Sequence, residues 1–85
     1  MSAYPYEVHE KDGGGLDAVV TTPGGEVLAG LANKLSLGPW TVTLFDGQGG
    51  HAAAVTGLDE STTRDLLQFH AALLSRTLTA EAVAS

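Results

Sequence analysis

The chain has 85 residues, with ten acidic side chains against four basic ones and no cysteine. This length permits a single domain over residues 1–85, because chains this short lie near the lower limit for burying a self-sufficient core. A sequence without Cys has no disulfide framework, no thiolate zinc site and no cysteine nucleophile. The net charge of −6 argues against nucleic-acid binding, which depends on clustered Lys and Arg.

The composition also bears on location and assembly. No apolar stretch approaches the roughly 20 residues of a membrane span, so we expect a cytoplasmic protein with no membrane association. Charged residues make up 16% of the chain, where about 25% is usual, which favours an oligomer or a bound partner over a free surface. Thr, Ser and Gly could cover the surface instead. The bias toward Ala, Gly, Leu and Thr with little Lys is typical of GC-rich genomes, and indicates a bacterial or phage accessory protein.

The first predicted elements are strands. Residues 4–9 alternate between apolar and polar side chains, the period-2 pattern of a half-buried strand, and Pro5 confines this strand to an edge or to a strand start. Residues 16–22 are rich in β-branched side chains and predict a second strand. Its apolar face consists of Leu16, Ala18 and Val20.

A Pro-Gly-Gly turn at 23–25 returns the chain into residues 26–30, which we expect to pair with the preceding strand as a hairpin. Apolar residues in 26–35 also fall at helical spacing, so a short helix is the alternative. We prefer the hairpin, because Gly30 costs a helix interior about 1 kcal/mol relative to Ala.

A second hairpin is predicted over residues 40–56. Residues 40–45 alternate with Trp40, Val42 and Leu44 on one face, and an Asp-Gly turn leads into 51–56. Ala52, Ala53 and Ala54 form strands poorly, so the pairing of this returning strand depends on its context.

Asp59 is placed to cap a helix, with Glu60 in the first turn, where the helix dipole favours negative charge. We expect a helix of roughly 17 residues, about 25 Å long, across the sheet, with Arg64, Asp65, Gln68 and Ser75 turned away from its apolar face. The fold class predicted is α+β: an antiparallel sheet of four to five strands with one long C-terminal helix on one face. Residues 1–3 and 78–85 are expected to be frayed ends. The apolar helix face should contain Leu66, Leu67, Phe69, His70, Leu73 and Leu74.

The sequence contains no arrangement of residues that is typical of a catalytic or metal site. The histidines stand far apart at positions 9, 51 and 70, with no spacing that fits a metal site, and His70 is expected to be a satisfied core residue. The Gly-rich run 47–50 lacks the following helix of a phosphate loop and is interpreted as a hairpin tip. Glu7 and Asp17 could face each other across a hairpin, but solvated carboxylates have ordinary acidity. We expect neither an enzyme nor a bound cofactor or metal.

The prediction for function is a non-catalytic interaction module, such as a regulator, inhibitor or adaptor, that forms a homodimer or binds another protein. Both faces of the predicted strands carry apolar side chains, and one helix covers one face. The alternatives are a small-molecule-binding module with a pocket between helix and sheet and, less favoured because of the charge, a nucleic-acid-binding sheet protein. The candidate interface residues are Tyr4, Tyr6, Val19, Trp40 and Phe45.

Overall fold

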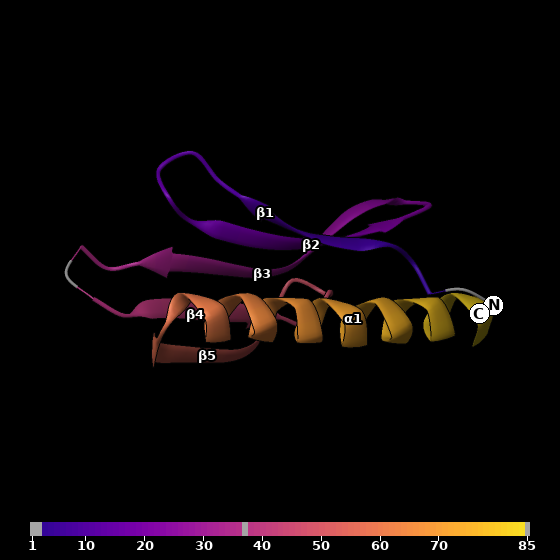
Figure 1. Cartoon of the computed structure of the whole chain (residues 1–85). Coiled ribbons are helices and arrows are strands. Elements are labelled where there is room, and N and C mark those ends of the chain that lie inside the picture. The colour runs from indigo at the N-terminus through magenta and orange to yellow at the C-terminus, as the bar shows by residue number, and fades with distance from the viewer. Residues whose placement is uncertain (1–2, 37, 85) are drawn as a thin grey trace.

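The computed structural model describes residues 3–36 and 38–84, and within these ranges it has a five-stranded antiparallel sheet followed by a single helix (Figure 1). The strands pair in chain order, β1-β2-β3-β4-β5, as a meander. The predicted α+β class is confirmed. The elements are β1 (Tyr6–Glu10), β2 (Leu16–Thr22), β3 (Gly25–Lys34), β4 (Trp40–Phe45), β5 (His51–Leu58) and α1 (Glu60–Ala84).

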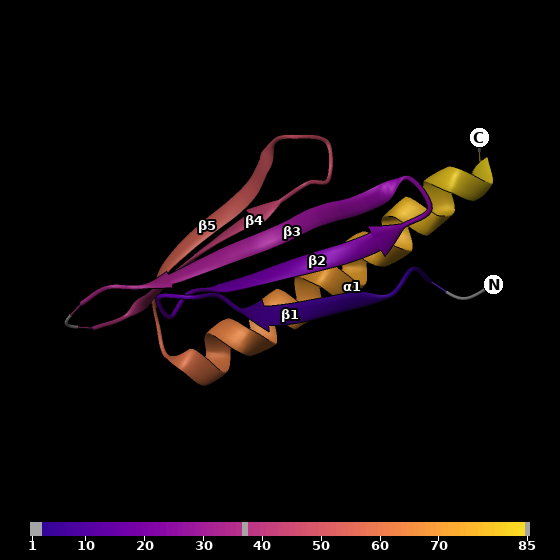
Figure 2. The ribbon, with the colours of Figure 1, turned by 90° about the horizontal axis from the view of Figure 1, so that it is seen from above.

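The helix α1 lies against one face of the twisted sheet, where it contacts β1 to β4. Seen from above, the sheet lies over the helix and its other face is bare (Figure 2). The alternation in β2 and β4 decides which side chains meet the helix, because neighbouring residues of a strand point to opposite faces. The buried apolar residues of this core are Leu16, Ala18, Val20, Ala29, Ala32, Trp40, Val42, Leu44, Leu67, Ala71 and Leu74.

Residues 26–34 belong to strand β3, which ends one residue before Leu35, and the alternative of a short helix is wrong. Gly30 explains why a glycine stands within this strand. A Cβ atom there would lie 2.8 Å from Cδ2 of Leu67 and 3.1 Å from the carbonyl oxygen of Thr43. The same residue that disfavours a helix therefore permits α1 to approach the sheet closely at Leu67.

The edge strand β5 contains three alanines, which form strands poorly, and it is held in the sheet by its pairing with β4. Two register shifts interrupt the pairing, one near each end, so that the eight residues of β5 oppose the six of β4. Every residue of β5 except Leu58 is exposed, because α1 does not extend over this edge.

The helix differs from the prediction in length and in orientation. It has 25 residues and runs to Ala84, and its last turns extend past the strands in Figure 2. Phe69 and Leu73, expected in the core, are 63% and 44% exposed. Ser75, expected in solvent, is fully buried. The helix is apolar on two sides, so periodicity alone could not decide which side would pack.

The buried Ser75 also connects the helix to the chain's beginning. Its hydroxyl donates to the carbonyl oxygen of Tyr4, and the N–H of Tyr4 donates to Oγ1 of Thr79 at 3.1 Å. Fraying of the ends stays a prediction. Positions 1, 2 and 85, which it includes, lie outside the described residues.

We predict that Leu67→Ala lowers the free energy of unfolding by about 2–5 kcal/mol, because it opens a cavity where the fully buried Leu67 packs over Gly30. Gln68→Ala, at the exposed neighbour, should change it by no more than about 0.5 kcal/mol. Urea denaturation at one fixed protein concentration measures both. Equal effects of the two substitutions would contradict this packing.

Candidate interaction surfaces

The uncovered face of the sheet carries a group of apolar side chains at its centre. In an antiparallel ladder, directly opposed residues lie on the same face, and Val19 opposes Leu28 in the pairing of β2 with β3. Leu31 and Phe45 share this face by the alternation of β3 and β4. Leu28 is 39% exposed, and the other three are half-buried. We call this group the open-face patch, and its members are Val19, Leu28, Leu31 and Phe45.

A hollow of about 290 Å³ borders one end of this patch. Leu28 and Phe45 line it together with Val27 and with two glycines of the β4–β5 turn, Gly47 and Gly49. The hollow gives the patch a concave end, into which a side chain of a partner could insert.

Acidic side chains border the patch on β1 and β2. His9 directly opposes Asp17, and its Nε2 lies 2.5 Å from Oε2 of Glu7 on the same strand. Nδ1 of His9 lies 3.5 Å from Oδ1 of Asp17, within ion-pair range. The hydrogen bond that the His9 ring donates to Glu7 raises the pKa of His9 above its ordinary value, and the charges of Asp17 and Glu26 act in the same direction. These groups give this side of the open face a negative potential.

The five predicted interface residues do not share one surface. Val19 and Phe45 lie in the open-face patch, whereas the other three lie on the helix side of the sheet. Trp40 is 6% exposed and belongs to the core, because it shares the alternation of the buried residues of β4. Tyr6 opposes Val20 and is 42% exposed at the sheet edge. Tyr4 packs against the core. The structure therefore does not bring these five candidates together on one surface, and their role in binding stays a prediction.

The sequence reasoning missed Leu28 and Leu31. The register shifts between Ala18 and Val19, so Ala29 and Gly30 are both buried and the alternation of β3 changes phase. Once 26–35 is taken as a strand, its apolar residues on both sides of Gly30 are the signal for a second apolar face.

His70 and the Gly-rich turn form hydrogen bonds within the chain, whereas His9 and His51 are exposed on the surface. The N–H of His70 Nε2 donates to the carbonyl oxygen of Phe45 at 2.7 Å, which links α1 to the end of β4. In the turn, Oδ1 of Asp46 accepts the N–H groups of Gln48 at 2.7 Å and Gly50 at 3.0 Å. These hydrogen bonds lower the pKa of Asp46. The carboxylate of Asp46 therefore occupies the backbone N–H donors of this turn that a bound anion would need.

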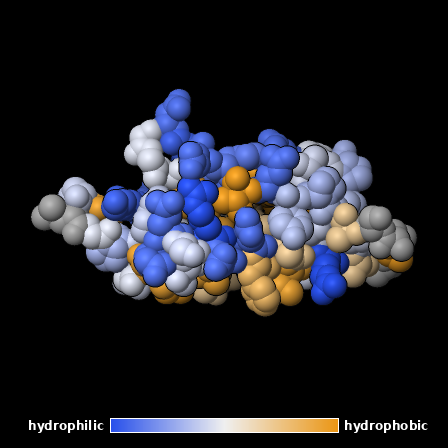
Figure 3. Space-filling model, viewed as in Figure 1, coloured by the Kyte–Doolittle hydropathy of each residue, from blue (hydrophilic) through white to orange (hydrophobic). Residues whose placement is uncertain are grey.

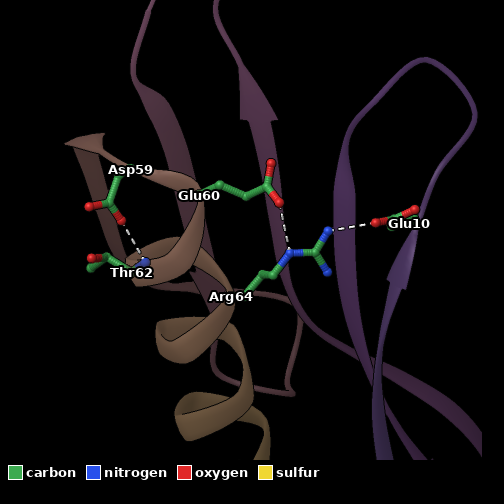
Figure 4. A network of polar contacts seen from close by, with 5 residues as sticks. All are labelled: Glu10, Asp59, Glu60, Thr62 and Arg64. Carbon is green, nitrogen blue, oxygen red and sulfur yellow. Dashed lines mark hydrogen bonds and ion pairs between the residues drawn. The ribbon is translucent and has the colours of Figure 1, made fainter.

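A polar network attaches the start of α1 to strand β1 (Figure 4). The N–H of Thr62 donates to Oδ1 of Asp59 at 2.7 Å, which confirms the expected cap and lowers the pKa of Asp59. Nη2 of Arg64 lies 2.6 Å from Oε1 of Glu10, and its Nε lies 3.2 Å from Oε2 of Glu60. Both carboxylates raise the pKa of Arg64. Solvent screens exposed ion pairs and leaves them little stabilising effect, so this network orients the helix more than it stabilises the fold.

A second hollow, of about 260 Å³, lies beside this network, between the helix start and the sheet. Three of the four basic residues in the sequence line it: Lys11, Lys34 and Arg64. Glu10 and Glu60 line it as well, and both contact Arg64.

We predict that His9 titrates above 6.5 in the folded protein and that Glu7→Gln moves its pKa back toward 6.5. A histidine whose pKa is raised by folding stabilises the native state while it is protonated. That contribution is complete below pH 6.5 and is lost as the pH rises through the folded-state pKa. Titration of the ring signals by NMR measures this. An unchanged pKa in Glu7→Gln would contradict the role assigned to Glu7.

Among residues 3–36 and 38–84, no three His, Asp or Glu side chains gather where they could hold a metal ion. The helix that the structure describes is not apolar enough to cross a membrane. Comparison with protein-family models, with curated proteins and with solved structures finds no match to this chain.

Proposed function

We propose that this protein is a non-catalytic interaction module whose open-face patch binds a partner protein. The observation that carries the proposal is the patch itself: four large apolar side chains lie together on a sheet face that the helix leaves bare. Scattered apolar side chains on a surface are ordinary, but a contiguous group that borders a hollow is typical of binding surfaces.

The charge around the patch indicates the chemistry of the partner. Glu7 and Asp17 flank His9 at one margin, and the chain as a whole carries a net charge of −6. Complementary charge at the rim of an interface speeds association and selects partners. The partner that fits best presents an apolar centre with Lys or Arg at its margin. A regulator, inhibitor or adaptor would use such a surface.

We predict that Leu28→Asp abolishes capture of the partner from a lysate of the host, because it places a carboxylate in the centre of the patch. Gln68→Glu adds the same charge on the helix surface and should leave capture unchanged. Mass spectrometry compares the proteins retained by each form, and circular dichroism confirms that both variants fold. Retention of the same proteins by the wild type and Leu28→Asp would contradict the proposal.

The hollow beside Arg64 supports a second candidate function, the binding of a small anion. Lys11 and Lys34 line it and form no ion pair with any residue that the structure describes. Arg64 at the same hollow is already paired with Glu10 and Glu60, so the two lysines without an ion pair are what favours a negatively charged ligand there.

If this hollow binds an anion, inorganic phosphate or citrate should raise the melting temperature of the wild type, because a ligand of the native state stabilises it. The double variant Lys11→Gln, Lys34→Gln should lose that rise. Arg76→Gln removes the one basic residue outside the hollow and serves as the control. A rise that persists in the double variant, or no rise in the wild type, would contradict this candidate.

A further inference from the structure

The helix α1 carries a second line of apolar side chains on the side away from the sheet. Phe69, Leu73 and Val83 are 63%, 44% and 61% exposed, Ala80 is exposed, and Leu66 is half-buried. These five residues are named the outer stripe. Figure 3 shows hydrophobic residues gathered along the lower edge of the molecule, where Figure 1 places α1 and β5.

The spacing of the outer stripe is that of a helix-to-helix seam. Its members stand at positions 66, 69, 73, 80 and 83, with Arg76 filling the remaining position of the pattern. Alternating steps of three and four residues keep side chains on one line of a helix that packs against another helix. The inner residues Leu67, Ala71 and Leu74 are buried against the sheet, and Leu66 packs partly against the same core. The exposed members of the outer stripe, from Phe69 to Val83, therefore form a separate surface.

Two charges at the stripe indicate what packs against it. Asp65 lies beside the stripe and Arg76 occupies the remaining position within it, eleven residues further on, and neither forms an ion pair with any residue that the structure describes. They are separated by about 16 Å along the helix at 1.5 Å per residue. Two antiparallel copies of α1 whose two-fold axis crosses at the level of Ala71 would place Arg76 of each copy within about 2 Å, along the axis, of Asp65 of the other.

We propose that two copies of this protein associate through the outer stripes of α1, packed antiparallel around that two-fold axis. In this register Phe69 of one copy lies level with Leu73 of the other, and Leu66 lies level with Arg76, whose long aliphatic stem can cover it. The five members of the stripe include no acidic residue. The paired part runs from Leu66 to Arg76, because this register places Ala80 level with Thr62 and Val83 level with Asp59 of the other copy.

A second copy fits this stripe better than an unrelated helix, because the two-fold axis pairs both free charges at once. The two sheets would then lie on the outside of the dimer with their open faces directed outward. The dimer would present two open-face patches, so a protein that binds the patch could be held at two sites. This inference uses a different surface from the proposed function and does not depend on it.

Sedimentation equilibrium tests the proposal. The wild type is expected to be a dimer, and Phe69→Asp, at a side chain already 63% exposed, is expected to be a folded monomer by circular dichroism. Val55→Asp places the same charge on the exposed edge strand β5 and should leave the dimer intact. A monomeric wild type would overturn the proposal, and so would a dimer lost in Val55→Asp and retained in Phe69→Asp, which would indicate pairing through β5.

Charge exchange tests the register. Asp65→Arg and Arg76→Asp should each weaken the dimer, about three- to tenfold in Kd, because each places like charges opposite one another twice. The double variant should regain the wild-type Kd, and failure to regain it would overturn the antiparallel register. Leu28→Asp should remain a dimer while it loses the captured partner, so the failure of this proposal and that of the open-face function can be told apart.

Discussion

The close contact of α1 with the sheet at Leu67 and Gly30 is the constraint on which the rest of the structure depends. A helix packs at its shortest distance where the opposing strand has no side chain, and Gly30 provides that position at the centre of the sheet. With Leu67 fixed there, the rotation of the helix is fixed as well. Phe69 and Leu73 then point to solvent, and Ser75 is directed toward Tyr4.

An 85-residue chain with a five-stranded sheet and a single described helix has more apolar surface than it can cover. The helix buries one face of the sheet and one side of itself. The other sheet face keeps the open-face patch, and the other side of the helix keeps the outer stripe. These two surfaces point in different directions, so one can hold a second copy while the other holds a different partner. The low charge content of the chain agrees with this excess of apolar surface, because its charged side chains are too few to cover both the open-face patch and the outer stripe.

The polar contacts orient the elements without contributing much to their stability. Arg64 attaches the start of α1 to β1, His70 attaches its middle to β4, and Ser75 with Thr79 attaches its later turns to the segment before β1. Each contact prevents the helix from rotating about its axis, because hydrogen bonds have direction and apolar packing does not. The exposed positions of the outer stripe are held outward in this way.

The sequence by itself determined the turns, the cap at Asp59, the fold class and the strands other than 26–35, where a short helix stayed open, because alternation and turn chemistry are local properties that neighbouring residues decide. It also identified Val19 and Phe45 on the uncovered face. Only the tertiary structure decided that Trp40 belongs to the core and that Leu28 and Leu31 complete the open-face patch, because a register shift in β3 changes the phase of its alternation. It also decided which side of α1 is buried. A helix that is apolar on two sides has no preferred rotation until a sheet with a glycine at the right place selects one.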